Sequence, residues 1–371
     1  MRILRVSYSV PPEPGGKERH VECLTREQLK RGHEVTLAFR RGDVVPEGAT
    51  VLPTRPTPLS VALGARSDVL AFAAEVGRAL RDAGPADLVH LHGDHVEAAV
   101  LGPVCRRRGI PLLLTVHGAM TRRHRPMARR ALRTVDAFIA LGTRPQGDLV
   151  ELGVDPRRIL AMSSGLDLES VSGFRSPVVR VPGLVVSVGS LDPVKNHELV
   201  IEAMAVLRRT RPGARLVIAG EGPERNRLRE LSGTGGAIEL AGHLGRKEIY
   251  ELVRRAQVFV LASRRLESKG EGVPTAALEA LALGTPVVLS SEASLDPVVP
   301  DHGVYRTFRS GSLDDLVAVL GAVLDDEEAR SRMGETGMRA VAALDWPVVA
   351  SRVEEWCRAA LPTGSRNGDA R

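Results

Sequence analysis

Residues 271–288 read EGVPTAALEALALGTPVV and contain the clearest local pattern in the chain. Pro274 and Thr275 are typical of a helix start, and Gly284 is typical of a helix end. The stretch therefore predicts a short helix over 275–283, followed by a buried strand. Because the first turn of a helix leaves backbone N–H groups unpaired, this helix start is a natural site for an anion.

Two carboxylates flank the predicted helix start. Glu271 precedes it, and Glu279 lies four residues beyond Thr275, about 6 Å along the axis at roughly 1.5 Å per residue. This spacing is close to that between a phosphate and the ribose hydroxyls of one nucleotide. The flanks of Glu279 are apolar, which predicts a buried helix whose single charge needs a partner. The layout suits a nucleotide diphosphate sugar, with one carboxylate on the sugar and the other on the ribose.

The composition is that of an ordinary globular protein. Its 371 residues, 43% of them hydrophobic, predict two domains with full cores. Three cysteines, far apart in sequence, form no metal-ligand spacing or disulfide framework, which is typical of a reducing compartment. The first apolar run is broken by Pro11 and Pro12, too early for a signal peptide, and no apolar run approaches the ~18 residues of a membrane span. We expect a cytoplasmic, soluble protein.

The net charge of +6 comes almost entirely from arginine. With 3% aromatic residues and no recognition motif, a nucleic-acid partner is not expected. A basic cleft for an anionic small substrate and contact with acidic lipid headgroups explain the charge equally well. The densest basic run, residues 122–125 with Arg129 and Arg130, predicts a solvated helix face, and weak peripheral contact with a membrane stays open.

Short apolar runs alternate with helical patterns along the whole chain, which favours parallel sheets covered by helices. The rhythm restarts after residues 165–182, which contain glycines, prolines and serines without a clear period. We therefore expect an α/β protein of two doubly wound, Rossmann-like domains, with ligands beyond the carboxyl ends of the strands. Strands are predicted at 2–8, 34–39, 87–91, 111–116, 136–141, 183–189, 214–219, 257–261 and 285–289. Helices are predicted at 17–31, 68–83, 93–108, 197–210, 223–231, 246–255, 275–283, 313–323, 325–343 and 346–360.

Two features of the first half follow predicted strands. Gly15 and Gly16 form a loop whose backbone can approach a phosphate or sugar, although a plain glycine turn is as common. His117 comes directly after the strand over 111–116, where a histidine is well placed for function. A zinc site is not expected, because the period-2 placement of two neighbouring histidines lacks further ligands. The histidines near the preceding strand end cannot be ranked among themselves: His90, His92 and His95.

In the second half, Lys195 lies shortly after a strand end, beside Asn196 and the helix that this asparagine is expected to cap. A lysine there can neutralise a diphosphate leaving group, and in a chain with few lysines we favour that function over an exposed loop residue. Gly220 and Gly222 form too short a pattern for a dinucleotide fingerprint, so a nicotinamide-dependent reductase is disfavoured. No Asp-x-Asp motif of the metal-dependent transferases is present.

Together these motifs resemble the retaining nucleotide-sugar glycosyltransferases of family four, which adopt the GT-B fold of two Rossmann-like domains facing a central cleft. The resemblance covers nearly the whole chain. Its matches are PPEPGGKERHVECLTREQLKRGHEVTL, DLVHLHGDHVEAAVL, PLLLTVHGAM, GLDLE, VGSLDPVKNHELVIEAM, LVIAGEGPER, LAGHLGRKEIYELVRRAQVFVLAS and EGVPTAALEALALGTPVV.

The resemblance implies a role for each matching residue. Glu271 would bind the donor sugar, Glu279 the ribose diol and Lys195 the diphosphate. His117, Glu271 and Lys195 would be the catalytic residues, and no metal or cofactor is implied. The other donor-binding residues would be Gly15, Gly16, Ser190, Asn196, Gly220, Gly222, His243, Leu244, Gly272, Val273, Pro274 and Thr275, and the acceptor would meet His92, His117 and Met120.

Two positions depart from the family pattern. Ser190 replaces an arginine that the family usually has before the lysine, so either another arginine contacts the phosphate or donor binding is weaker. At the predicted linker, Ser164 replaces an asparagine but the following glycine is kept. The domains implied are an acceptor-binding domain over 1–170, a nucleotide-sugar domain over 171–345, and a segment over 346–371 whose helix crosses back to the first domain before a disordered tail.

The expected activity is transfer of a hexose or N-acetylhexosamine, preferably from a UDP-sugar, to a hydroxyl of a small-molecule, lipid or glycan acceptor. Such an enzyme would serve carbohydrate biosynthesis or natural-product glycosylation. A sugar phosphorylase or polysaccharide synthase on the same fold is an alternative. A non-catalytic nucleotide-sugar-binding protein is another, and Ser190 is the feature that favours it.

Overall fold

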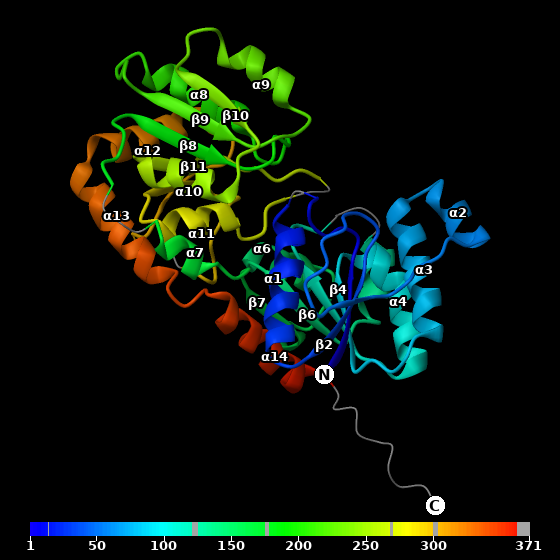
Figure 1. The fold of residues 1–371 in the computed structure, drawn as a ribbon. Helices are drawn as coiled ribbons and strands as arrows, with labels where there is room; N and C mark the ends of the chain where they lie inside the picture. The colour runs from blue at the N-terminus through cyan, green and yellow to red at the C-terminus, as the bar shows by residue number, and fades with distance from the viewer. Residues whose placement is uncertain (14, 121–124, 175–177, 268–269, 300–302, 362–371) are drawn as a thin grey trace, which may run out of the picture. The chain divides into compact units, whose positions relative to one another are not determined.

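The structure is a computed structural model that describes residues 1–13, 15–120, 125–174, 178–267, 270–299 and 303–361. The chain divides into two compact units. The first comprises Met1–Gly165 together with the segment from Trp346 onward, and the second comprises Leu166–Asp345. Each unit contains one parallel sheet with helices packed against it, as expected for two Rossmann-like domains (Figure 1).

The first unit is built on a seven-stranded sheet in the order β3-β2-β1-β4-β5-β6-β7. Its strands are β1 (Arg2–Ser7), β2 (Glu34–Ala38), β3 (Thr50–Val51), β4 (Leu88–His92), β5 (Leu112–Val116), β6 (Ala137–Leu141) and β7 (Ile159–Met162). Its helices are α1 (Gly16–Lys30), α2 (Pro58–Gly64), α3 (Asp68–Asp82), α4 (His95–Arg108), α5 (Arg125–Leu132), α6 (Thr143–Glu151), the 3-10 turn η1 (Pro156–Arg158) and α14 (Trp346–Ala360).

The second unit is built on a six-stranded sheet in the order β10-β9-β8-β11-β12-β13. Its strands are β8 (Leu184–Val188), β9 (Arg215–Ala219), β10 (Ile238–Gly242), β11 (Val258–Leu261), β12 (Val287–Ser290) and β13 (Arg306–Phe308). Its helices are α7 (Leu168–Ser172), α8 (His197–Leu207), α9 (Arg225–Ser232), α10 (Arg246–Arg255), α11 (Thr275–Ala282), α12 (Leu313–Asp325) and α13 (Glu327–Ala340).

Alternate residues of each central strand enter different cores. Val185 of β8 packs in the core that contains α8 and α12, whereas Leu184 and Val186 pack in the core that contains α10 and α11. Because successive strand residues point to opposite faces, this alternation places helices on both faces of the sheet. The near-continuous apolar runs of the sequence therefore reflect strands buried on both sides.

The last helix, α14, belongs to the first unit and lies beside α1 (Figure 1). Arg31, which follows α1, has one guanidinium nitrogen 3.6 Å from Glu354 of α14, and its Nη2 donates to the carbonyl oxygen of Pro347. The apolar side of α14, including Trp346, packs against β1 and α1 residues such as Ile3. This helix covers part of one face of the first sheet.

Several elements escape the sequence pattern. The strands β3, β7, β10 and β13 are the edge strands of the two sheets, and at least half of the residues in each are partly or fully exposed, so they lack a long buried apolar run. The expected linker contains α7, whose first turn is capped by Asp167 accepting from the N–H of Ser170 at 3.0 Å. Across the described residues, no helix combines the length and the apolar character needed to cross a membrane. The final ten residues, expected to be disordered, lie outside the described part.

Candidate active site

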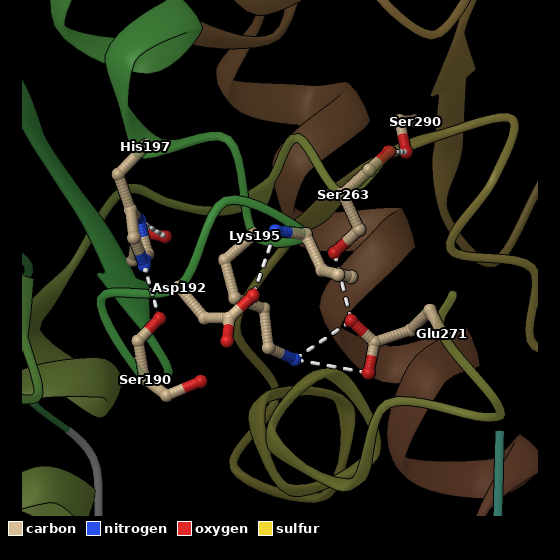
Figure 2. A network of polar contacts seen from close by, with 9 residues as sticks. Ser190, Asp192, Lys195, His197, Ser263, Glu271 and Ser290 are labelled. Carbon is tan, nitrogen blue, oxygen red and sulfur yellow. Dashed lines mark hydrogen bonds and ion pairs between the residues drawn. The ribbon is translucent and has the colours of Figure 1, made fainter. Parts of the chain in front are cut away.

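Three polar side chains meet at the carboxyl end of the second unit's sheet. Lys195 lies on the loop after β8, Ser263 lies just after β11, and Glu271 lies on the loop that leads into α11. Figure 2 shows the lysine ammonium directed at the glutamate carboxylate, with the serine hydroxyl on the other side. Ligands of open α/β sheets bind at this end of the strands.

The ion pair is close and mostly buried. Lys195 Nζ donates to Oε1 and Oε2 of Glu271 at 2.9 and 2.7 Å, and the two side chains are only 18% and 14% exposed. The lysine loop is itself fixed, since the N–H of Lys195 donates to the carbonyl oxygen of Asp192 at 2.9 Å. At Gly189 a Cβ would lie 3.3 Å from Lys195 Cε, so this glycine leaves room for the lysine stem.

Ser263 holds the second carboxylate oxygen of Glu271. Its hydroxyl donates to Oε2 at 2.8 Å, and the serine is completely buried. Its own carbonyl oxygen accepts from the Ser290 hydroxyl at 2.5 Å, which ties the site to the end of β12 (Figure 2). Sequence reasoning missed Ser263, although a serine directly after the buried strand β11 was an available signal.

A second missed residue braces the same loop. Arg264 donates from its backbone N–H to the carbonyl oxygen of Val194 at 2.7 Å, and from Nε to that of Pro193 at 2.8 Å. These bonds join the loop after β11 to the loop that carries Lys195. Glu267, also on the loop after β11, is exposed.

The start of α11 is open to a ligand. Its N-cap residue is Pro274, and no side chain caps the helix. Val273 and Pro274 are buried, whereas Gly272 and Thr275 keep part of their surface. An uncapped helix start beside a lysine favours an anion, because unpaired N–H groups and the helix dipole act together.

Glu279, one turn into α11, finds its partner in Tyr250 of α10. The tyrosine hydroxyl donates to Oε1 at 2.9 Å, and the ring is 1% exposed. The Phe174 ring packs on Tyr250 edge to face at 5.6 Å. The apolar flanks of Glu279 predicted a partner but not its identity, because a tyrosine on another helix carries no local signal.

The residues before α8 have mixed outcomes. Ser190 is exposed and its carbonyl oxygen accepts from His197 Nε2 at 3.3 Å. Asn196 takes the N-cap position but makes no side-chain cap, so the expected cap is wrong; its φ of 51° turns its side chain from the geometry that a cap needs. Burial, followed by the nearby Lys195 ammonium, lowers the pKa of His197 to about 4.

The glycines after β9 are explained by loop packing. A Cβ on Gly220 would lie 1.9 Å from the carbonyl oxygen of Gly189, and one on Gly222 would lie 2.5 Å from that of Leu191. Both contacts bring the β8 and β9 loops together, so contact of these glycines with a donor stays a prediction. The same holds for His243, which is exposed after β10, and for Leu244 beside it.

In the first unit, α1 begins at Gly16 after Gly15, and no side chain caps this helix. A Cβ on Gly15 would lie 2.1 Å from Glu18 Oε2, so a larger residue there would displace the Glu18 side chain. Glu18 in turn accepts a hydrogen bond from the Ser9 hydroxyl. Part of the preceding turn, at residue 14, lies outside the described residues.

Four histidines gather at the carboxyl ends of β4 and β5. His92 Nδ1 lies 3.0 Å from His117 Nε2, and His90 Nε2 lies 2.8 Å from the Thr115 hydroxyl. The His20 ring of α1 lies 5.0 Å from the His117 ring, edge to face. Burial lowers the pKa of His20 to about 3 and takes those of the other three well below their usual value.

The expected acceptor residues differ in accessibility. His92 and Met120 are 0% and 3% exposed, which speaks against direct contact of either side chain with an acceptor, whereas His117 is half-buried. Of the basic run, Arg125 and Arg129 both donate to the carbonyl oxygen of Glu151, at 3.1 and 3.2 Å, which favours a structural role. Residues 122–124 lie outside the described part of the chain.

Within the described ranges, no group of three or more histidine, cysteine, aspartate or glutamate residues is arranged to hold a metal ion. A cavity of about 710 Å³ in the second unit lies between α10 and the amino ends of β8, β9 and β10. It is lined by residues such as Leu184, Leu216 and Leu252. It therefore sits at the opposite end of the sheet from Lys195.

Comparison with known proteins agrees with this geometry. The family described as Glycosyltransferase Family 4 matches residues 14–170, and the one described as Glycosyl transferases group 1 matches residues 176–340. The chain is 28% identical to a glycogen synthase of Mycobacterium tuberculosis, over 95% of this chain and 93% of that protein. It is 30% identical to a D-inositol 3-phosphate glycosyltransferase of Acidothermus cellulolyticus, over 78% of this chain and 73% of that protein.

Among solved structures, Anabaena HepE in complex with UDP-glucose aligns with a TM-score of 0.75 and 16% identity, covering 97% of this chain and 100% of that chain. At that identity the likeness establishes the fold, which is GT-B, and confirms the expected fold class. Together, the two family matches and this fold place the chain among the glycosyltransferases of the GT-B class. The chain belongs to glycosyltransferase family 4, as the sequence motifs implied.

Proposed function

We propose that this glycosyltransferase moves a sugar from a nucleotide diphosphate sugar to an acceptor hydroxyl with retention of configuration and without a metal. The observation that carries the proposal is the Lys195–Glu271 pair at the uncapped start of α11. The lysine ammonium and the N–H groups at the helix start match a diphosphate. The carboxylate beside them matches the hydroxyls of the sugar ring joined to that diphosphate.

The diphosphate is assigned to Lys195 and the first turn of α11. Charge-assisted hydrogen bonds of this kind are worth about 1.5–3 kcal/mol each. They stabilise the negative charge that grows on the leaving group, and being preorganised they need no rearrangement during the reaction. The lysine and helix dipole supply the positive charge that a metal provides in other transferases, so activity is expected to survive chelators.

The sugar is assigned to Glu271 and the ribose to Glu279. When the donor enters, Lys195 moves from the carboxylate to the diphosphate, and Glu271 is left to accept hydrogen bonds from sugar hydroxyls. Ser263 keeps the carboxylate in place throughout, because it holds Oε2 independently of the lysine. Glu279 is similarly held in place by the hydrogen bond that Oε1 accepts from Tyr250.

The chemical step breaks the bond between the anomeric carbon and the diphosphate oxygen. The acceptor hydroxyl forms the new bond on the same face of the ring, and its proton passes to the departing phosphate oxygen. Atoms and charge balance without a protein base, and the configuration is retained.

A UDP-linked hexose or N-acetylhexosamine is the favoured donor, since HepE, which shares the fold, was solved with UDP-glucose. The acceptor class is a hydroxyl-bearing small molecule, lipid or glycan. The names of the relatives include molecules as different as glycogen and D-inositol 3-phosphate. All three acceptor classes therefore belong in the screen.

The test is transfer by the purified chain from a panel of nucleotide sugars, with the anomeric configuration of the product read by NMR. Glu271→Ala is expected to reduce turnover roughly 100-fold, a loss typical for one preorganised transition-state contact. Glu267→Ala, which removes an exposed glutamate of the same loop, is the matched control. Turnover of Glu271→Ala within a few-fold of wild type would contradict the assignment.

The same assay separates the alternatives. A phosphorylase would form a sugar phosphate from a glycan and inorganic phosphate and would ignore nucleotide sugars. A polysaccharide synthase would extend its product repeatedly rather than once. A non-catalytic binding protein would bind UDP in calorimetry yet release no free nucleotide from any donor.

A further inference from the structure

The structure pairs two histidines at the ends of neighbouring strands. His92 is the last residue of β4, and His117 follows β5, which pairs with β4 in parallel. Their facing nitrogens, His92 Nδ1 and His117 Nε2, lie 3.0 Å apart. One must carry the proton and the other the lone pair, so the tautomer of either ring fixes that of the other.

The buried side of His92 decides which ring donates. Its Nε2 is buried and has no hydrogen-bond partner. A buried N–H without an acceptor is rarer and costlier in proteins than a buried lone pair without a donor. The lone pair therefore belongs on Nε2 and the proton on Nδ1, which makes His92 the donor to His117.

His117 must then accept at Nε2 and carry its own proton on Nδ1. The structure has no hydrogen bond at His117 Nδ1 within its described residues, and the side chain is half-buried rather than enclosed. An N–H donor that is not fully buried is thus left at His117 Nδ1, at the carboxyl edge of the first unit's sheet.

The surroundings keep both rings neutral. The charged or titratable groups that act on His92 are His90, His117, His20 and the buried guanidinium of Arg5. Those that act on His117 are His20, Lys17 and His90. The His90 and His92 rings lie 4.2 Å apart, close enough that a charge on one would oppose a charge on the other. No carboxylate is among these neighbours, so nothing nearby favours an imidazolium.

We propose that His92 is a positioning residue that fixes His117 as the Nδ1–H tautomer, so that His117 donates a hydrogen bond to a substrate oxygen and does not act as a general base. The identity of the substrate in this inference rests on the proposed function, whereas the tautomer of His117 does not depend on it. It also agrees with retention, because a retaining step of the kind described above takes no proton into the protein.

The tautomer is read first, without substrate, by long-range nitrogen–proton NMR of the histidine rings in the full chain near pH 7.5. His117 is expected to show a protonated Nδ1 and an unprotonated Nε2. His90 is an internal reference: its Nδ1 is buried without a partner, so it should show the opposite tautomer, with the proton on Nε2 toward Thr115. A His117 ring protonated on Nε2, or on both nitrogens, would overturn the proposal.

Two variants then test the role. His92→Leu removes the donor, and His92→Asn keeps an amide N–H close to the position of Nδ1. The leucine variant is expected to shift His117 toward the Nε2–H tautomer and to lower kcat about tenfold, with KM for the donor changed less, as for one lost transition-state hydrogen bond. The asparagine variant should recover most of the Nδ1–H tautomer of His117 and most of kcat.

An unchanged kcat in a folded His92→Leu variant whose tautomer has shifted would also overturn the proposal. If the chain transfers no sugar from any donor but shows the expected tautomers, that result would contradict the proposed function and leave the assigned tautomer standing. The two failures are therefore distinguishable.

Discussion

Lys195 Nζ lies within hydrogen-bonding distance of both carboxylate oxygens of Glu271, at 2.9 and 2.7 Å. The group assigned to the diphosphate and the group assigned to the sugar therefore neutralise each other in this structure. The pair keeps either charge from being buried without a partner. It also means that a ligand lacking the sugar must compete with Glu271 for the lysine.

The first prediction follows from that competition. Glu271→Gln removes the competing charge, so UDP alone is expected to bind the variant about threefold more tightly, on the scale of a partly exposed ion pair. Transfer of the sugar should fall at the same time. Calorimetry measures the first effect and a turnover assay the second. Equal or weaker binding of UDP by the variant would show that Glu271 does not hold the lysine back.

The second prediction concerns Lys195 itself. Lys195→Met is expected to weaken UDP binding by about tenfold or more, because a charge-assisted contact to the diphosphate is lost. Lys247→Met, which removes an exposed lysine of α10 in the same unit, serves as the control. If both variants bind UDP like the wild type, the diphosphate is held elsewhere.

The third prediction concerns the brace of Glu279. Tyr250→Phe deletes the hydroxyl that donates to Oε1 at 2.9 Å and keeps the aromatic ring. The loss should cost about 1 kcal/mol in the free energy of unfolding and raise KM for the donor a few-fold, with kcat nearly unchanged. Urea unfolding and steady-state kinetics provide the two measurements. A fall in kcat at constant KM would argue against a role of Glu279 in ground-state binding of the ribose.

The fourth prediction is acid lability. The folded chain lowers the pKa of His20 to about 3 and that of His197 to about 4, both below the ordinary value of about 6.5. Below pH 6.5 the unfolded chain therefore binds protons that the folded chain does not. Stability is complete above pH 6.5 and falls as the pH drops toward 4, by up to about 1.4 kcal/mol per pH unit for each histidine.

Urea unfolding at pH 7, 6 and 5 measures that slope. His197→Asn, in the second unit, should reduce the dependence of the free energy of unfolding on pH. His243→Asn, at an exposed position, should leave that dependence unchanged. A free energy of unfolding that stays constant or rises on acidification would contradict the neutral, buried state of these histidines.

The sequence was most informative where its signals are local. The apolar runs at 184–188 and 258–261 are strands with both faces buried. Such a run can be recognised from its own residues, without knowing which segments pack against it. The same applies to the start and end of α11, which Pro274 and Gly284 mark directly. Family membership followed from the order of such local motifs.

The features that the sequence did not predict depend on contacts between distant segments. Ser263 and Tyr250 reach Glu271 and Glu279 only after the sheet and helices have assembled, so the sequence does not show which carboxylate each of them holds. The edge strand β10 escaped notice because its partly exposed residues lack the apolar run of a central strand. His92 was expected to meet the acceptor, and only the packing of β4 against β5 shows that it lies behind His117 instead.

The most direct measurement is a crystal structure of the chain with an intact, non-hydrolysable UDP-sugar. The account predicts a diphosphate against the first turn of α11 and within reach of Lys195, with Glu271 turned to the sugar and Glu279 to the ribose. A ligand bound with its diphosphate away from that helix end, with the Lys195–Glu271 pair still closed, would contradict it.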